Sequence, residues 1–189
     1  MNRLRGSTCY LAGSMTDLPD LGVGWRQAIT PDLEELGVVV FDPCDKQIEI
    51  GQEGQSQRQY LQQYRDSGDF EAVAKFMKVI RRVDLRCVDL ASFVIVRLDG
   101  TPTMGTYEEI ATSVSEQKPT LIWLGGNLTK KNVNPWLFAQ VDPKYVFESW
   151  EELKAYLKVI DDCDGHPEDR RWMLFKFEEM FRKVLPCSQ

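Results

Sequence analysis

Short apolar runs that alternate with stretches of helical periodicity constrain the fold of this chain most strongly. β-prone runs occupy residues 8–12, 38–41, 93–96, 120–124 and 145–147. Apolar residues recur at helical spacing over residues 25–36, 70–90, 106–116 and 150–160. Strands that alternate with helices at these lengths form a parallel sheet with helices on both faces. The pattern therefore predicts an α/β fold, a three-layer sandwich around a five-stranded parallel sheet.

The predicted strand order already points to a ligand site. Five strands favour the flavodoxin-like, Rossmann-like order 2-1-3-4-5, in which the connections reverse direction between the first and third strands. Ligands of such sheets bind at the carboxyl ends of the strands beside that reversal. Residues 12–15 and 98–100 follow these two strands, so a site is expected between them. The first two strands read as continuous apolar runs and are expected to be buried.

Two segments extend beyond this minimal fold. Residues 47–68 are rich in Gln, Gly, Ser and Asp and read as a long loop or irregular helix, in which Tyr60 and Tyr64 are either solvated or close over a ligand. An amphipathic stretch over residues 168–185 is expected to form a helix that packs on the sheet or on a second copy. We therefore predict an α/β domain over residues 1–160 and a C-terminal helical appendage over residues 161–189.

The charge balance limits the partners. The 189 residues include 23 Lys and Arg against 29 Asp and Glu, a net charge of −6. Affinity for phosphate backbones needs clustered Lys and Arg, so nucleic-acid polymers and anionic membranes are not expected as partners. No apolar run approaches the roughly 18–20 residues that span a bilayer, and the first residues lack the apolar stretch of a signal peptide. We expect a cytoplasmic protein that acts on a small molecule.

The supply of histidine and cysteine limits the chemistry. The five cysteines are widely spaced and form no Cys-x-x-Cys pair, so neither a disulfide framework nor a structural zinc site is expected. The single histidine, His166, lies in a polar stretch typical of a solvated loop. Complete Gly-x-Gly-x-x-Gly and P-loop motifs are absent. The sequence predicts no metal and no organic cofactor, which leaves carboxylate chemistry.

A turn of small residues, Gly13-Ser14-Met15, follows the first predicted strand. Glycine lets a ligand approach the backbone, and free N–H groups with the hydroxyls of Ser14 and the following Thr16 can bind a phosphate or sugar oxygen. An ordinary turn between a strand and a loop explains the same residues equally well.

Residues 105–110 begin a predicted helix on the other side of the expected site. Thr106 is expected near the N-cap with Glu109 three residues on, as in a capping box. In a functional interpretation, a carboxylate in the first helical turn is held ionised by the helix dipole and acts as a nucleophile. Glu108 and Glu109 lie about 100° apart around the helix, so one points into the cleft while the other points elsewhere.

A further acidic residue, Asp84, lies near the end of the long helix before the third strand. Its position between Arg82 and Arg86 fits a salt-bridged surface residue. Alternatively, it is a second carboxylate near Glu109 that supplies the acid/base partner required by glycosyl transfer.

Taken in order, these motifs resemble the nucleoside 2-deoxyribosyltransferase family, which includes deoxynucleoside-monophosphate N-glycosidases. The matching segments are residues 10–15, 84–85, 99–100, 105–110 and 118–119. The resemblance implies a flavodoxin-like domain, commonly homo-oligomeric, that needs no cofactor. It also implies cleavage of the N-glycosidic bond of a small-molecule (deoxy)nucleoside or its monophosphate through a glutamate nucleophile.

The resemblance assigns roles to individual residues. Glu109 matches the nucleophile better than Glu108, and Asp84 matches the aspartate that contacts the sugar and assists proton movement at the base. Expected substrate contacts are Tyr10, Gly13, Ser14, Met15, Asp99, Gly100, Gly105 and Thr106. The family signature that completes a neighbouring subunit's site has only a positional match here, at residues 134–136.

Alternatives to this enzyme remain open. A non-catalytic nucleotide-binding or sensor module on the same fold would account for segment 47–68 and the C-terminal helix, which the small catalytic fold leaves unexplained. An NAD glycohydrolase would use similar carboxylate chemistry. In a transferase a second base attacks the glycosyl-enzyme, whereas in a hydrolase water does. The outcome depends on how easily water enters the site and on how tightly the free base is bound.

Overall fold

The computed structural model of the protein describes residues 2–15, 18–46, 50–101, 103–163 and 171–174. Its strands form one sheet in the order β2-β1-β3-β4-β5, and every pairing is parallel. The strands are β1 (Thr8–Gly13), β2 (Val39–Phe41), β3 (Phe93–Leu98), β4 (Thr120–Leu124) and β5 (Val146–Phe147). The predicted five-stranded parallel sheet and its strand order are confirmed, and the carboxyl ends of β1 and β3 lie side by side as the site prediction requires.

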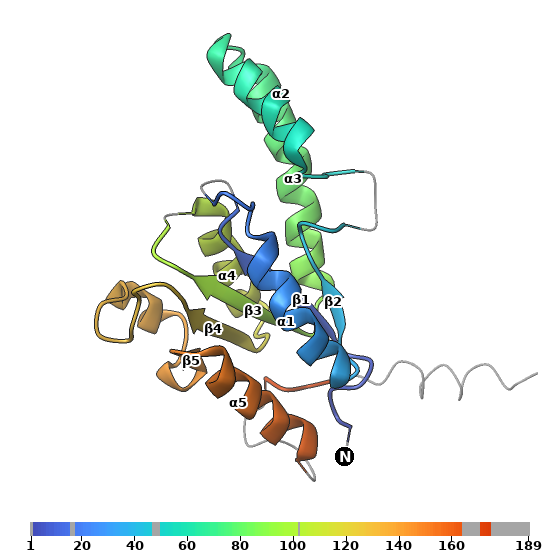
Figure 1. Cartoon of the computed structure of the whole chain (residues 1–189), viewed down its shortest axis with the longest axis vertical. Coiled ribbons are helices and arrows are strands. Elements are labelled where there is room, and N and C mark those ends of the chain that lie inside the picture. The colour runs from blue at the N-terminus through green and yellow to red at the C-terminus, as the bar shows by residue number, and fades with distance from the viewer. Residues whose placement is uncertain (1, 16–17, 47–49, 102, 164–170, 175–189) are drawn as a thin grey trace, which may run out of the picture.

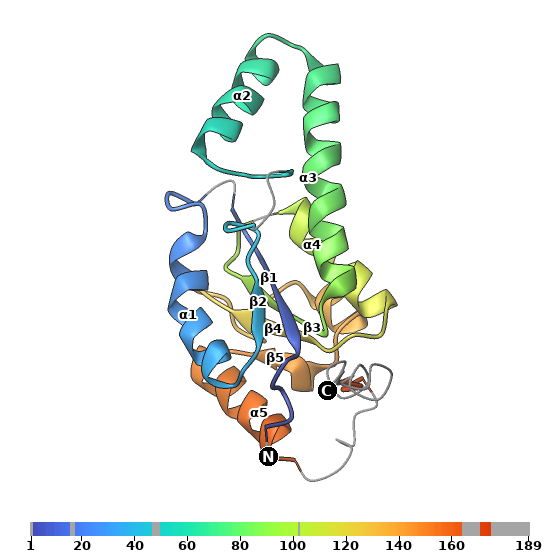
Figure 2. The same ribbon diagram turned by 90° about the vertical axis from the view of Figure 1, so that its right-hand side faces the viewer.

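Helices cover both faces of this sheet, which gives three layers (Figure 2). Helices α1 (Val23–Glu35) and α5 (Trp150–Asp162) lie on one face, and α3 (Phe70–Leu90) and α4 (Met104–Ser115) lie on the other. Helix α1 buries Trp25, Ile29 and Leu33, which are four residues apart and so share one side of a helix. Helix α5 crosses the predicted domain boundary at residue 160.

The second strand differs from its prediction. Strands β1, β3 and β4 are almost completely buried, as their continuous hydrophobicity predicts. In β2, however, Val39 is 51% exposed. The prediction of a buried β2 was wrong because this strand is at the edge of the sheet, where it has only one neighbour.

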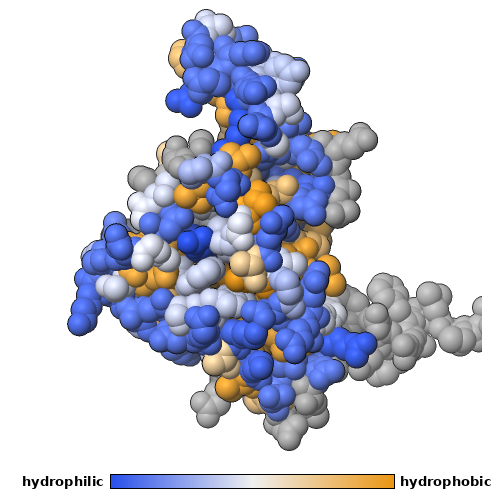
Figure 3. Space-filling model, viewed as in Figure 1, coloured by the Kyte–Doolittle hydropathy of each residue, from blue (hydrophilic) through white to orange (hydrophobic). Residues whose placement is uncertain are grey.

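Helix α2 (Gln55–Asp66) and the first half of α3 form an arm that projects beyond the sheet (Figure 1). Helix α2 buries no residue, and the outer part of this α2–α3 arm is mostly hydrophilic (Figure 3). The prediction for residues 47–68 left a long loop and an irregular helix open, and the loop was wrong for residues 55–66, which form a regular α-helix. The few apolar residues of this helix, Tyr60, Leu61 and Tyr64, are outnumbered by polar ones, so the sequence gives only a weak signal of a helix.

Only four residues of the predicted C-terminal appendage beyond Cys163 are described. One of them, Trp172, packs against the sheet and α5. Trp172 is 1% exposed, its ring centroid lies 5.3 Å from that of Phe93, and its Nε1 donates a hydrogen bond of 2.8 Å to Tyr156 Oη. The predicted helix over residues 168–185 was wrong for residues 171–174, which are not helical, and its other residues lie outside the described ranges, as do His166 and Thr16. Across the described ranges, none of the helices combines the length and the apolarity needed to cross a membrane.

Candidate functional site

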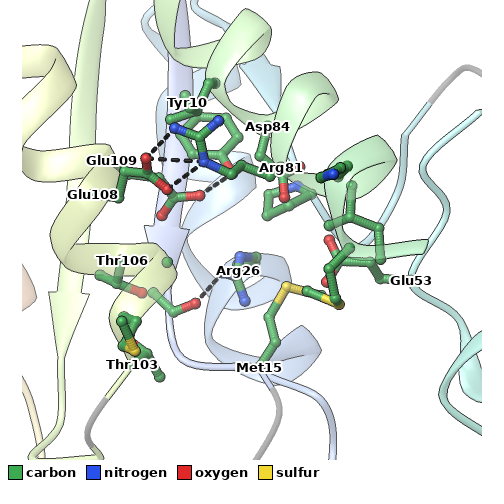
Figure 4. A pocket seen from close by; sticks show the side chains of 18 of the residues that line it. Tyr10, Met15, Arg26, Glu53, Arg81, Asp84, Thr103, Thr106, Glu108 and Glu109 are labelled. Carbon is green, nitrogen blue, oxygen red and sulfur yellow. Dashed lines mark hydrogen bonds and ion pairs between the residues drawn. The ribbon is translucent and has the colours of Figure 1, made fainter. Parts of the chain in front are cut away.

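A cavity of about 640 Å³ opens at the carboxyl end of β1, between α3, α4 and the segment that follows β2 (Figure 4). Its volume lies within the range of about 300–1,000 Å³ that is typical of small-molecule sites. Most of the predicted site residues line it, namely Tyr10, Gly13, Met15, Asp84, Gly105, Thr106 and Glu109. The chain reversal between β1 and β3 thus brings together residues up to a hundred positions apart.

Glu109 lies on α4 and is bound by a tyrosine from β1. The Tyr10 hydroxyl donates a hydrogen bond of 2.6 Å to Glu109 Oε1, and both side chains are buried. The short distance is typical of a hydroxyl bound to an ionised carboxylate. Tyr10 therefore fixes the direction of the Glu109 side chain inside the cavity and favours its charged form.

The ionisation of Glu109 differs from the prediction. The helix begins at Met104 with Thr103 as its N-cap, so Thr106 is not the cap and Glu109 lies in the second turn. Burial raises the pKa of Glu109 to about 8, the hydrogen bond from Tyr10 lowers it, and the charge of Asp84 raises it further. The expected capping box was wrong because the N-cap is Thr103 and not Thr106. The expected dipole-held carboxylate was wrong because Glu109 lies beyond the first turn, where desolvation outweighs the helix dipole.

The neighbouring glutamate points away from Glu109, as helical geometry predicts. Glu108 Oε1 and Oε2 accept hydrogen bonds of 2.9 and 2.8 Å from Arg81 Nε. This ion pair lies at the rim of the cavity, where the Glu108 side chain is 39% exposed. Of the two adjacent glutamates, only Glu109 is buried.

Asp84 faces the cavity and is bound by a lysine rather than by its arginine neighbours in the sequence. Lys46 Nζ lies 2.8 Å from Asp84 Oδ1 and 2.8 Å from Glu53 Oε1, and it donates a hydrogen bond of 2.7 Å to the Gly51 carbonyl. Burial raises the pKa of Asp84 to about 6, the charge of Glu53 raises it as well, and that of Lys46 lowers it. Asp84 is thus a partly desolvated carboxyl group and not a surface residue.

A fully buried arginine supports the floor of the cavity. Arg26 donates hydrogen bonds to the carbonyl oxygens of Leu11, Gly13 and Gly22 at 3.1, 3.0 and 2.9 Å. At Gly13, where φ is +155°, a Cβ atom would lie 2.9 Å from the Trp25 ring. The end of β1 is therefore held by Arg26 and leaves no room for a side chain at Gly13.

The remaining predicted contacts lie beside the cavity rather than in its lining. Ser14 Oγ donates a hydrogen bond of 3.3 Å to Asp99 Oδ1, which also accepts one of 3.1 Å from the Thr101 backbone. These bonds tie the turn after β1 to the turn after β3. Gly100 lies in the second of these turns, so the three residues hold the walls of the site together.

Two other groups of predicted residues lie away from this cavity. Trp136, in the short 3₁₀ helix η1 (Pro135–Ala139), is 73% exposed and is not part of the lining. Tyr60 is 56% exposed on α2, and Tyr64 faces a separate hollow of about 510 Å³ between α2 and α3. The homo-oligomer implied by the family resemblance stays a prediction.

Three charged residues of the site gave no signal in the sequence. Arg26 lies between Trp25 and Gln27 on α1, and Lys46 and Glu53 belong to a polar segment with no motif. Arg26 and Lys46 bind backbone carbonyls, and Asp84 lies far from Lys46 in the sequence, so spacing could not reveal these contacts. In the part of the chain that the structure describes, no three His, Cys, Asp or Glu side chains are grouped so as to hold a metal ion.

The Tyr10→Phe variant tests the Tyr10–Glu109 hydrogen bond. A hydrogen bond to a charged group contributes about 1.5–3 kcal/mol, which corresponds to roughly one to two pKa units. We therefore expect the pKa of Glu109 to rise by about that amount, as measured by NMR titration of ¹³C-labelled side-chain carboxyl groups. Tyr60 is exposed, so the control variant Tyr60→Phe should leave the pKa of Glu109 unchanged. An unchanged pKa of Glu109 in Tyr10→Phe would disprove the role of the Tyr10 hydrogen bond.

Comparison with known proteins supports the fold. Neither protein-family models nor curated protein sequences match this chain. Among solved structures, the chain is similar to the 2-deoxyribosyltransferase of the psychrotolerant bacterium Bacillus psychrosaccharolyticus, with a TM-score of 0.54 and 16% sequence identity. The match covers 79% of this chain and 92% of that chain. The two proteins therefore share the five-stranded α/β architecture.

Proposed function

We propose that the protein cleaves or transfers at the N-glycosidic bond of a (deoxy)nucleoside or nucleoside monophosphate, with Glu109 as the nucleophile. One observation carries this proposal: a buried glutamate is bound by Tyr10 and faces the same cavity as a second carboxyl group, Asp84. The shared fold with a 2-deoxyribosyltransferase supports the same class of reaction.

The reaction divides into two steps. In the first, the bond between C1′ and the base nitrogen breaks, its electron pair leaves with the base, and a proton from the Asp84 carboxyl neutralises that nitrogen. A carboxylate oxygen of Glu109 forms a bond to C1′, which gives a glycosyl-enzyme. In the second step, water or another base attacks C1′, returns a proton to Asp84, and releases Glu109.

The environment of Glu109 suits a transition state with positive charge on the sugar. Glu109 is 9% exposed, so little water screens its charge. A carboxylate in such a low-dielectric site stabilises a developing oxocarbenium ion more than the neutral substrate. The same burial that raises its pKa therefore favours the transition state over the ground state.

The two carboxyl groups predict a bell-shaped pH profile of kcat/KM. The pKa of Asp84 is raised to about 6 and that of Glu109 to about 8, so one proton resides on the pair between these values, mostly on Glu109. The reactive form, with the proton on Asp84 and Glu109 ionised, is the minor arrangement of this singly protonated pair, and its population has the same pH dependence. Below about pH 6 both groups are protonated and the nucleophile is lost. Above about pH 8 both are ionised and the acid is lost.

Initial rates measured from pH 4 to pH 10 check this prediction. We expect a maximum near pH 7 and a decline on both sides. A rate that keeps rising above about pH 9 would contradict a role for a protonated carboxyl group in the free enzyme.

A substrate panel tests the proposed function. The protein is incubated with deoxynucleosides, ribonucleosides and their monophosphates, with and without an added acceptor base, and the products are separated by chromatography. Free base without acceptor indicates a hydrolase, whereas a new nucleoside that forms only with acceptor indicates a transferase. Tight nucleotide binding without turnover of any member would contradict the proposal and favour a non-catalytic binding module.

A further inference from the structure

A lysine lies between two carboxyl groups at one wall of the cavity. The Nζ atom of Lys46 is 2.8 Å from Glu53 Oε1 and 2.8 Å from Asp84 Oδ1. The lysine side chain is 3% exposed, and those of Glu53 and Asp84 are 16% and 14% exposed. Because both oxygen atoms contact the same nitrogen, the two carboxyl groups lie next to each other.

The lysine binds its two acidic partners unequally. It donates hydrogen bonds to the Gly51 carbonyl and to Glu53 Oε1. Its contact with Asp84 is an ion pair without hydrogen-bond alignment, since Asp84 Oδ1 is buried and accepts no hydrogen bond from the described residues. A buried carboxylate oxygen that accepts no aligned hydrogen bond is stabilised less than one that does, so Asp84 is the better of the two positions for a proton.

The charge count leads to the same result. With both carboxyl groups ionised, the cluster carries one positive and two negative charges in a region with little water. One proton removes the excess negative charge, and two adjacent carboxyl groups are known to share a proton for this reason. Lys46 keeps the second group ionised.

We infer that Glu53 and Asp84 act as one proton-holding pair clamped by Lys46, which makes Glu53 a functional residue and Lys46 a positioning residue of the site. This inference deepens the proposed function and rests on it for the step in which the proton is used. When the C1′–N bond breaks, the proton moves from the pair to the base nitrogen. The pair is then fully ionised and bound by Lys46 until the attacking water or base returns a proton.

Other groups also act on the pair and are unchanged in the variants below. Tyr10 on β1, Cys87 on α3 and Glu109 on α4 interact electrostatically with Asp84. Further charged groups line the same cavity, namely Arg26 on α1, Lys78 and Arg81 on α3, and Glu108 on α4. Comparison of variants with the wild type therefore isolates the contributions of Lys46 and Glu53.

Two substitutions should move the titration of Asp84 in opposite directions. Glutamine has nearly the same shape as glutamate but carries no charge, so Glu53→Gln should lower the pKa of Asp84 by about one unit or more. Lys46→Met removes the positive charge, so the pKa of Asp84 should rise by about one unit or more. Both are measured by NMR titration of ¹³C-labelled carboxyl groups in the substrate-free protein, with the Asp84 signal assigned from Asp84→Asn.

Conservative and distant variants serve as controls. Lys46→Arg keeps the charge and should restore most of the wild-type titration, whereas Glu71→Gln, an exposed glutamate in the first turn of α3, should not move it. The low-pH limb of the kcat/KM profile should shift in the same directions as the titration, which a merely structural role would not produce. If Lys46→Met fails to fold, the pKa of Asp84 in Glu53→Gln still tests whether the two carboxyl groups share a proton.

The result separates this inference from the proposed function. If Glu53→Gln leaves the pKa of Asp84 unchanged, the inference of a proton-holding pair is wrong, whether or not the protein is active. A wild-type protein that turns over no nucleoside overturns the proposed function, while the titration still decides whether the pair exists.

Discussion

The Glu109→Gln variant is expected to release base from its best substrate at least about 10³-fold more slowly than the wild type. The amide has nearly the same shape as the carboxylate, and its oxygen can still accept the hydrogen bond from Tyr10. It cannot, however, form the bond to C1′ or place a negative charge beside the developing oxocarbenium ion. Removal of an enzymatic nucleophile commonly reduces kcat by several orders of magnitude.

The adjacent glutamate provides the matched control for this variant. Glu108 has the same chemistry one position away, but it is bound by Arg81 at the rim of the cavity. Glu108→Gln should therefore keep kcat/KM within about threefold of the wild type, since an exposed ion pair contributes about 1 kcal/mol or less. Equal losses in the two variants, or none in Glu109→Gln, would show that the nucleophile is misassigned.

The Arg26→Leu variant is expected to lose about 3–5 kcal/mol of unfolding free energy. Arg26 is completely buried and donates to three backbone carbonyls at the end of β1 and the start of α1. Leucine would leave these acceptors unpaired, at about 1–3 kcal/mol each before relaxation. For a protein of this size, the loss corresponds to a decrease in Tm of roughly 6–20 °C.

Urea denaturation followed by circular dichroism measures this loss. Arg86→Leu is the control, because the Arg86 side chain is 64% exposed and, within the described ranges, forms an ion pair with Asp89 on the same helix face. Its free energy of unfolding should stay within about 0.5 kcal/mol of the wild type. A change of less than about 1 kcal/mol in Arg26→Leu would mean that the three carbonyls find other partners.

The layered sheet was predictable because its signal is local. Each buried strand is a short apolar run, and the helices that cover the sheet carry apolar residues at helical spacing. Helix α2 was harder to predict, since it buries no residue fully and its three apolar residues are outnumbered by polar ones. The exposure of Val39 depends on how many neighbours β2 has, which is a property of the sheet and not of the strand.

The candidate site was predictable in its acidic residues and not in their environment. Glu109 and Asp84 belong to motifs that follow one another in a fixed order, and the chain reversal between β1 and β3 predicted the edge of the sheet at which both side chains lie. The pKa of each depends on burial and on Lys46, Glu53 and Tyr10, whose contacts bridge long distances along the chain. Local helix geometry alone suggested an ionised Glu109, whereas packing makes it a carboxyl group with a raised pKa.

Mass spectrometry of the protein stopped in mid-reaction tests the central claim most directly. The wild type is mixed with its best deoxynucleoside without acceptor, quenched in acid within one turnover, and digested. We expect the peptide that contains Glu109 to carry one added deoxyribosyl group, and the same peptide from Glu109→Gln to carry none. An adduct on any other residue, or base release by the wild type with no adduct at any quench time, would contradict a glycosyl-enzyme on Glu109.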